Sequence, residues 1–450
     1  MSMGKKEAKR LVDLVLAQAS FGDVRVRVTA STRGHLRFGA GCPTTAGDVD
    51  GVTVEVTASK DGRTATVTGS RTDEAAVAVL VQRAEGLAGL SPVDPEHMPP
   101  LSASKPPKVK AEDGAVKGMS AKVRADLVGR AIRRAEGDRV EVAGLLDHEH
   151  HAEAVGNRAG LFVYHARTEV SLSATCRTDD GTGSARGGYV SHALRGLVPE
   201  ALVSDAATRA SASQLPGKRD PGRYPVILTS QAVADLLEFL VHALDARRAG
   251  EGRSAFSRPG GGKGAGKGTG TLVGETLFDG RVHLWSDPTD PANPADPFEG
   301  EGRAQGKVDW VVDGELRALH ASRYWADREK LPDLPTPSSL HMDGGTDELE
   351  ALIAGFDRGV LISRFWYNRM LDPQRLLVTG LTRDGTFWVE KGKIVEPIRN
   401  FRFNDSPLSV LKKVVALGRP QRAGLSRGRV MVVPPLVVSE FELASGSDAV

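Results

Sequence analysis

The residues best suited to metal chemistry in this chain are Glu238 and His242, an acidic side chain and a histidine four positions apart. On a helix this spacing places both side chains on one face, one turn apart. A carboxylate and an imidazole held in this way can form part of a metal site. Asp245, at i+7 from Glu238, would extend the same face. An ordinary ion pair on a helix surface has the same spacing, and we favour it over residual catalysis.

The segment around these residues has the pattern of a helix that follows a strand. Residues 223–229 form a strand-like run, and Ser230 is a good helix N-cap because its hydroxyl can accept a hydrogen bond from a first-turn N–H. Apolar residues then recur every three or four positions, which predicts one buried stripe. These residues are Val233, Leu236, Leu237, Leu240, Val241 and Leu244.

A second signal follows this helix in the turn Ser254-Ala255-Phe256-Ser257. The helix and the turn together resemble the TldD/PmbA (TldE) family of metallopeptidase-related proteins. Catalytic members of that family carry a helical His-Glu-x-x-x-His motif followed by a Ser-x-Phe-Ser-like turn. In this resemblance Leu237 stands where the first histidine is expected. Glu238 holds the general-base position, and His242 is the second histidine.

Weaker patterns spread the resemblance over most of the chain after about residue 120, and their order makes the family assignment fairly specific. They lie at residues 157–160, 171–174, 274–275, 298–302, 352–360 and 387–394. The thiolate that the catalytic branch supplies near its C-terminus has no counterpart, since Cys42 and Cys176 are the only cysteines. The resemblance therefore implies the fold of the family but an incomplete zinc site, at which His242 alone is a clear ligand.

The function that the resemblance implies is that of a subunit in a TldD/TldE-type metalloprotease acting on peptides or unstructured polypeptides, closest to the non-catalytic TldE/PmbA-like branch. The implied partner is a TldD-like catalytic subunit or a second copy of this chain. Zinc would sit in the catalytic partner, with no cofactor in the isolated chain. One alternative is an active zinc metallopeptidase that uses Glu238, His242 and non-standard ligands such as Asp245. A third is a basic-loop phosphate or nucleic-acid binder.

Two other stretches imitate functional motifs. The stretch Asp147-His148-Glu149-His150-His151 invites a zinc interpretation, but its spacing fits no helical zinc motif, and we expect a solvated strand end or turn. Residues 261–268 match Gly-x-x-x-x-Gly-Lys but end in Gly268, where a P-loop needs Ser or Thr. The segment is expected to be a basic surface loop.

Neither Cys176, predicted in a strand, nor Cys42, predicted in a flexible loop, supports a nucleophile, and His341 is expected to be structural.

Composition excludes several classes of protein. The 450 residues carry 59 basic and 57 acidic side chains, a net charge of +2, so no overall field recruits nucleic acid or a membrane surface. Two distant cysteines fit a reducing compartment, and we expect a cytoplasmic protein. The N-terminal run is interrupted by Asp13 and has helical spacing, which favours an amphipathic helix over a signal peptide. No segment approaches the ~20 apolar residues of a membrane span.

The predicted fold class is α+β, with two small α+β domains before a larger domain. The boundaries are residues 1–110 and 115–222, with a proline-rich linker at Pro92–Pro107 near the end of the first unit. Residues 223–450 are predicted to be a TldD/PmbA-like domain, built mainly on antiparallel sheet, that holds the helix described above in a cleft. Strands are expected from the alternating valines near residues 24–28 and 52–56, and tight turns from Asp313-Gly314 and Lys391-Gly392. Asp73-Glu74 and Ser120 are expected to begin helices. Near the C-terminus the patterns predict a helix at residues 407–416 and a strand pair at residues 429–441.

Overall fold

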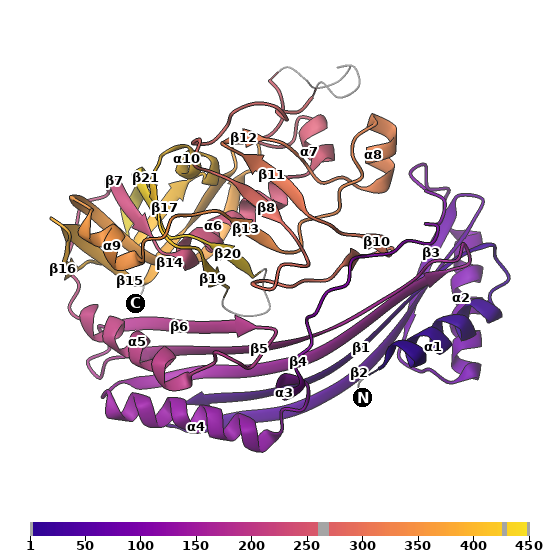
Figure 1. Cartoon of the computed structure of the whole chain (residues 1–450), viewed down its shortest axis with the longest axis horizontal. Coiled ribbons are helices and arrows are strands. Elements are labelled where there is room, and N and C mark those ends of the chain that lie inside the picture. The colour runs from indigo at the N-terminus through magenta and orange to yellow at the C-terminus, as the bar shows by residue number, and fades with distance from the viewer. Residues whose placement is uncertain (1–2, 260–269, 425–429, 448–450) are drawn as a thin grey trace.

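The computed structural model describes residues 3–259, 270–424 and 430–447. A long, curved antiparallel sheet runs beneath a second layer formed by the C-terminal half of the chain (Figure 1). Within the described residues this sheet has six strands in the order β3-β2-β1-β4-β5-β6. The strands are β1 (Asp23–Gly39), β2 (Cys42–Lys60), β3 (Arg63–Gly69), β4 (Glu141–Asn157), β5 (Phe162–Arg177) and β6 (Ser184–Ser191).

The pairing of β1 with β4 joins the two α+β units that the sequence predicts. It extends from Arg25 opposite Asn157 to Phe38 opposite Gly144. The strands of both units therefore belong to one continuous sheet, although the chain between them leaves the sheet for 70 residues or so. The proline-rich stretch within that excursion has neither helix nor strand, as predicted. The domain boundaries themselves remain a prediction.

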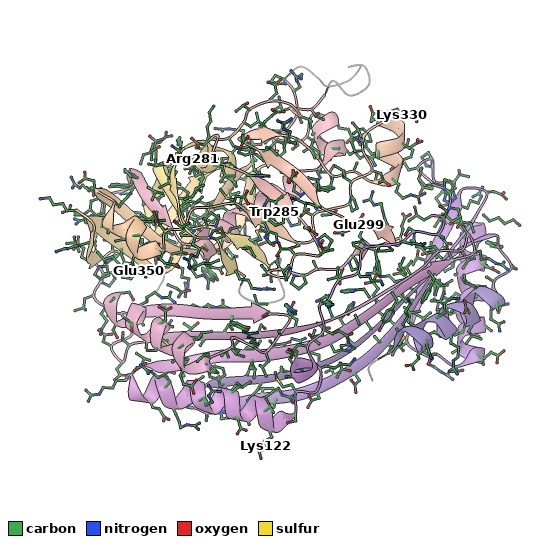
Figure 2. All side chains as sticks on the ribbon, in the orientation of Figure 1. Lys122, Arg281, Trp285, Glu299, Lys330 and Glu350 are labelled. Atoms are coloured by element: carbon green, nitrogen blue, oxygen red, sulfur yellow. The ribbon has the colours of Figure 1, made fainter. Side chains whose placement is uncertain are left out.

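All the helices of the first half cover one face of the long sheet. They are α1 (Lys5–Gln18), α2 (Glu74–Leu90), α3 (Gly114–Lys117), α4 (Ala121–Gly137) and α5 (Pro199–Ala212). Because strand side chains alternate, Val24, Val26 and Val28 of β1 are buried against α1 and α2, while Arg25 and Arg27 face the C-terminal layer. Lys122 on α4 points away from that layer (Figure 2). None of the described helices is both long and apolar enough to cross a membrane.

Two sheets build the C-terminal half, and both are mainly antiparallel. In the described residues, five strands of the larger sheet form a closed ring, β14-β7-β21-β17-β15, because β15 also pairs with β14. The larger sheet comprises β7 (Gly222–Leu228), β14 (Arg358–Asp372), β15 (Leu377–Glu390), β16 (Lys393–Pro397), β17 (Phe401–Asp405), β18 (Val414–Leu417) and β21 (Leu436–Gly446). The smaller sheet comprises β8 (Leu284–Ser286), β11 (Val308–Val312), β12 (Glu315–Leu316), β13 (Leu340–Met342), β19 (Gln421–Ala423) and β20 (Met431–Val433).

Helix α6 (Ser230–Ala243) packs against strands of both sheets, and its apolar side belongs to the main core. Phe365, Phe403 and Phe441, from three strands of the ring, lie within 5.5 Å of one another, measured between ring centroids. The remaining helices are short and lie around the two sheets. They are α7 (Ala246–Gly250), α8 (Arg323–Glu329), α9 (Leu349–Ala354) and α10 (Pro407–Lys412). The α+β fold class is thus confirmed.

Several local predictions are wrong. Residues 407–416, predicted as one helix, form α10 and then strand β18, because Val414 pairs with Val438 of β21. The predicted strand pair at residues 429–441 is instead two strands in different sheets, since β20 pairs with β13 and β21 pairs with β7. Cys42 begins β2 in a hairpin and does not lie in a flexible loop.

A hairpin of the C-terminal half, β9 (Phe298–Glu299) with β10 (Arg303–Ala304), meets the long sheet. Its Phe298 packs with Val155, Leu161 and Val163, and Leu101 of the proline-rich stretch joins them. Figure 2 places Glu299 on the side of the upper layer that faces the long sheet. Gly302 fits here because its φ is +89° and an added Cβ would lie 2.7 Å from Leu161 Cδ2.

We predict that Gly302→Ala destabilises the protein more than Gly300→Ala. Both glycines have positive φ in the same hairpin, but no heavy atom lies within 4 Å of a Cβ added at Gly300. The collision with Leu161 should cost about 1 to 3 kcal/mol. The φ of +89° at Gly302 also lies farther from the left-handed region that L-residues can adopt than the φ of +39° at Gly300, which adds to the difference. Urea unfolding of the two variants measures this difference. Equal midpoints would contradict the assigned contact.

Candidate functional site

The candidate site is built around helix α6, whose two ends are held by side chains. Thr229, one residue earlier than predicted, is the N-cap and accepts a hydrogen bond from Ala232 N. At the other end, Ser254 Oγ donates to the carbonyl of Ala243, the last helical residue, at 3.2 Å. Phe256 is fully buried in the core. The Ser-x-Phe-Ser turn therefore has a structural task, which is to fix the end of the helix.

The three positions singled out from the sequence lie on different sides of α6. Leu237 is 1% exposed and packs in the main core, whereas Glu238 and His242 are exposed. A side chain at position 237 therefore points into the core, and one at 238 or 242 points away from it. The expected ion pair between Glu238 and His242 does not form: the two are not within 4 Å of each other, and neither has a partner among the described residues.

Asp245 does not extend this face as predicted, because α6 ends at Ala243. Instead it is the N-cap of α7, where Oδ1 accepts a hydrogen bond from Arg248 N at 3.0 Å. The chain changes direction between the two helices, so the i+7 relationship to Glu238 is lost. Within the described parts of the chain, no group of three or more His, Cys, Asp or Glu side chains could hold a metal ion.

The histidine-rich stretch lies in the middle of β4, not at the solvated end or turn that we expected. Strand alternation divides its side chains between the two faces of the sheet. His148 and His150 are buried on the helix face, where Arg124 Nη1 lies 2.9 Å from His148 and Glu112 lies 2.9 Å from His150. His151 is on the other face. Burial lowers the pKa of both His148 and His150, which favours the neutral form.

The other sequence candidates have structural surroundings. Cys176 is buried on β5, and burial raises the pKa of its thiol to about 11, which makes it a poor nucleophile. His341 is buried and stacks on Trp285 with ring centroids 4.0 Å apart. The P-loop-like match at residues 261–268 lies outside the described residues. The residues that flank this segment are described, and among them Leu272 N donates a hydrogen bond to Phe256 O.

An acidic residue that the sequence patterns did not single out, Asp235, lies on α6 beside Glu238. Its carboxylate accepts hydrogen bonds from Phe365 N and from Gln231 Nε2, both at 2.8 Å. Burial raises the pKa of Asp235 to about 6, although these hydrogen bonds and the charge of Arg364 act in the opposite direction. Its signal in the sequence is an aspartate between Val233 and Leu236 of the apolar stripe.

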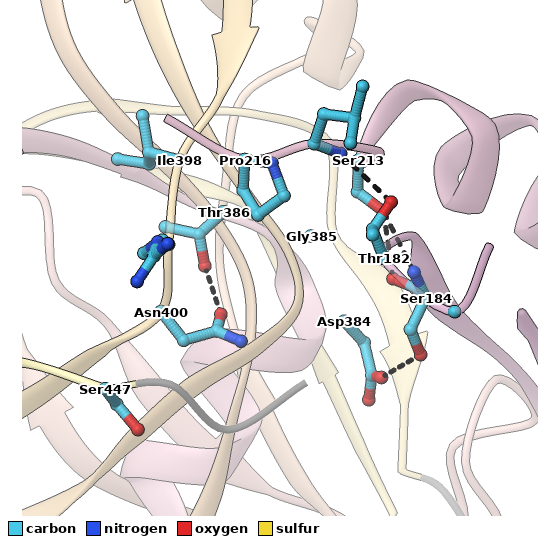
Figure 3. A pocket seen from close by; sticks show the side chains of 13 residues that line it. Thr182, Ser184, Ser213, Pro216, Asp384, Gly385, Thr386, Ile398, Asn400 and Ser447 are labelled. Atoms are coloured by element: carbon cyan, nitrogen blue, oxygen red, sulfur yellow. Dashed lines mark hydrogen bonds between the residues drawn. The ribbon is translucent and has the colours of Figure 1, made fainter. Parts of the chain in front are cut away.

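An ion pair between Arg364 and Asp384 lies close to Asp235 and links the two halves of the molecule. Arg364 Nη1 is 3.2 Å from Asp384 Oδ2, and both side chains are less than a tenth exposed. Ser184 on β6 of the long sheet donates to Asp384 Oδ1 at 3.3 Å, as Figure 3 shows. Both strands carry further charged and polar residues, so no pattern in the sequence distinguishes Arg364 and Asp384 from them.

Two cavities flank this ion pair. The one in Figure 3 has a volume of about 540 Å³, and its polar groups bond to one another, with Thr386 Oγ1 2.9 Å from Asn400 Oδ1. The other is larger, about 970 Å³, and is lined by Thr229, the N-cap of α6, and by Ser230 and Gln231 of its first turn. Helix α6 thus borders a cleft as predicted, but at its N-terminus and not at Glu238 and His242.

We predict that Asp235 makes stability fall as pH rises from about 4 to about 7. Its folded-state pKa of about 6 is above the unfolded value of 3.8, so between these values the folded state holds more protons. Urea midpoints measured across this range should fall more steeply for the wild type than for Asp235→Asn, whose amide oxygen can still accept from Phe365 N. The exposed Asp126→Asn is the matched control. Identical slopes for wild type and Asp235→Asn would contradict the prediction.

Three solved structures are similar to this one over nearly their whole length. TldE from Thermococcus kodakarensis has a TM-score of 0.84 and 17% identity, covering 97% of this chain and 99% of its own. A proposed modulator of a DNA gyrase from Thermotoga maritima has a TM-score of 0.82 and 20% identity, and the match covers 96% of this chain and 99% of that one. A proposed modulator of DNA gyrase from Bacteroides thetaiotaomicron has a TM-score of 0.81 and 18% identity, and the match covers 98% of this chain and 99% of that one. At these identities the likeness establishes a shared fold.

Family models locate the resemblance in the sequence itself. The PmbA/TldA metallopeptidase central domain matches residues 104–214, and the PmbA/TldA metallopeptidase C-terminal domain matches residues 221–445. A search of curated proteins finds no match. The two domain models cover most of the 450 residues and include helix α6 with its Ser-x-Phe-Ser turn, and the chain therefore belongs to the PmbA/TldD family of metallopeptidase-related proteins.

Proposed function

We propose that this chain is the non-catalytic, TldE-like subunit of a TldD/TldE-type metalloprotease that acts on peptides or unstructured polypeptides. The observation that carries the proposal is the environment of Leu237, which stands where the catalytic branch has its first histidine. Leu237 is 1% exposed within the main core, among Leu236, Leu240 and Val241. An apolar side chain there contributes to folding, and the position has become part of the packing.

The residues at the family's metal position do not fit zinc. A catalytic zinc ion needs three protein ligands and an open position, whereas this helix offers the imidazole of His242 with Glu238 beside it. The alternative, an active enzyme that recruits Asp245, is less well supported because Asp245 already caps α7 and pairs with Arg248. We therefore assign the zinc to a catalytic partner and none to the isolated chain.

The partner that we propose is a TldD-like chain, with a second copy of this chain as the other possibility. A surface suited to such a contact lies on the β14–β15 hairpin. Trp366, Tyr367 and Leu371 are 40%, 60% and 53% exposed, and arginines stack on the two aromatic rings. Aromatic and arginine side chains are enriched in protein interfaces. The TldE of Thermococcus kodakarensis, which shares this fold, carries the name of the proposed role.

We place this activity in the cytoplasm and assign it no nucleic-acid partner. Both cysteines are free, which fits a reducing compartment. The net charge of +2 gives no broad electrostatic attraction for a polyanion, so the interpretation as a nucleic-acid binder has the least support.

We predict that Glu238→Gln leaves the peptidase activity of a complex with a TldD-like chain nearly unchanged. Loss of a true general base removes a factor of ~10² to 10⁴ in rate, whereas Glu238 is proposed to have no catalytic task. The assay compares both complexes at equal assembly, with the corresponding glutamine variant of the catalytic chain as the positive control. Elemental analysis of the purified single chain should find no stoichiometric zinc. A hundredfold loss of rate, or stoichiometric zinc in the single chain, would show that this chain is itself an enzyme.

We also predict that the double variant Trp366→Ser, Leu371→Ser weakens assembly with the partner at least tenfold, because central aromatic anchors carry much of the energy of an interface. Sedimentation velocity of the chain alone and with a TldD-like chain measures assembly. Val79→Ser, on α2 and 63% exposed, is the control for loss of an exposed apolar side chain. If the double variant assembles as tightly as the wild type and the control, the β14–β15 surface is not the interface.

A further inference from the structure

The cavity of about 970 Å³ lies between the long sheet and the C-terminal layer, apart from Glu238 and His242. Strand β6 and helix α5 form one wall, with residues 186–189 and 196–212. The start of α6, part of β14 and helix α9 form the opposite wall. The cavity therefore depends on how the two halves of the molecule pack together.

The N-terminus of α6 presents an unpaired hydroxyl to this cavity. Ser230 is only 7% exposed, and its Oγ has no hydrogen-bond partner among the described residues. Thr229 already fills the role of N-cap, and its own hydroxyl donates to Ser363 O at 2.5 Å. The first N–H groups of a helix have no intrahelical acceptor, and together with the helix dipole they favour an anion. A buried, unpaired hydroxyl is unfavourable, and a bound acceptor would remove that cost.

Two arginines bring positive charge to the same cavity. Arg364 is 8% exposed and follows Ser363, the partner of Thr229. One of its Nη atoms pairs with Asp384, but its Nε has no partner in the part of the chain that the structure describes. Arg186, on β6, makes no ion pair within the described part of the chain. Burial, and then the charge of Arg364, lower the pKa of Arg186, although the charges of Asp384 and Asp235 act in the opposite direction.

The carboxylates on the cavity wall do not cancel this charge. Asp205 pairs with Arg209 at 2.7 Å, and Glu348 pairs with Arg419 at 2.8 Å. Glu350 is exposed on α9, at the edge of the molecule in Figure 2. The buried side-chain atoms of this wall that lack a partner among the described residues are Ser230 Oγ, Arg364 Nε and Arg422 Nε, all of which can donate.

Much of the remaining wall is apolar. Its side chains include Leu197, Leu202, Leu349, Ile353, Leu361 and Phe387. A small inorganic anion would leave this surface and most of the volume unused. Ligand cavities of this kind, apolar with a few fixed polar groups, bind organic molecules whose polar part is oriented by those groups.

We propose that this cavity binds an organic carboxylate with an apolar body, and specifically the C-terminal carboxylate of a peptide with an apolar last residue. The carboxylate lies at the N-terminus of α6, where it accepts hydrogen bonds from Ser230 Oγ and from Arg364 and Arg186. The apolar side chain lies among the leucines of α5 and α9. The choice of a peptide rests on the proposed function, whereas the carboxylate site rests on the cavity alone.

The test is calorimetric titration of the full chain with N-acetyl-Ala-Leu-Phe as the free acid and as the C-terminal amide. The acid should bind at least tenfold more tightly, since the amide lacks the charge that the arginines and the helix recognise. Inorganic phosphate in a third titration should bind more weakly than the acid, because it cannot contact the apolar wall.

Ser230→Ala separates binding from stability. Removing an unpaired buried hydroxyl should leave the thermal midpoint unchanged or higher, while affinity for the acid falls about tenfold, the value of one hydrogen bond to a charge. Arg186→Gln should weaken binding of the acid to a similar extent, because Arg186 makes no ion pair with the described residues that the fold would lose. Arg133→Gln, an exposed arginine on α4, is the matched control and should bind the acid like the wild type.

Three results would overturn the proposal: no binding of the acid, equal affinity for acid and amide, or phosphate binding as tightly as the acid. Unchanged affinity in both Ser230→Ala and Arg186→Gln would place any binding elsewhere. The titrations need neither zinc nor a partner chain. Their failure is therefore distinguishable from failure of the proposed subunit role, which is tested by metal content and by the activity of the complex.

Discussion

The burial of helix α6 between two sheets is the constraint on which the C-terminal half depends. Its apolar stripe supplies Leu236, Leu237 and Leu240 to the main core, and removing a buried leucine typically costs about 2 to 5 kcal/mol. The same burial determines what the rest of the helix can do. Rotation about its axis is fixed, so Glu238 and His242 face outward while the first turn opens into the large cavity. A metal ligand at position 237 would have to replace a core side chain.

The long sheet imposes a similar order on charged residues. In a strand, neighbours point to opposite faces, so the consecutive polar residues of β4 are divided between the helix side and the side of the C-terminal layer. Arg27 and Arg33 on β1 pair with Glu153 and Asp147 across the strands on the latter side. What looks in the sequence like a metal-binding cluster is therefore two separate rows, each with its own partners.

Some local signals in the sequence predicted the structure correctly, others near the C-terminus did not, and the long-range contacts gave no signal. Asp73 and Ser120 begin α2 and α4 as N-caps, and Lys391-Gly392 forms a turn with both residues at positive φ. Each depends on side chains within four positions. By contrast, the Arg364–Asp384 pair and its link to Ser184 require the packing of segments far apart in the chain. The raised pKa of Asp235 arises from burial between elements that no local pattern describes.

The order of strands in the ring has a kinetic consequence. Strand β7, residues 222–228, lies between β14, residues 358–372, and β21, residues 436–446. During synthesis β7 emerges long before either neighbour, so its hydrogen-bonding edges stay unpaired until most of the chain has left the ribosome. Such non-local pairing slows folding and leaves strand edges open to association with other chains. The C-terminal half thus has a long interval of vulnerability during biosynthesis, whereas the hairpins β1–β2 and β4–β5 can form soon after they are made.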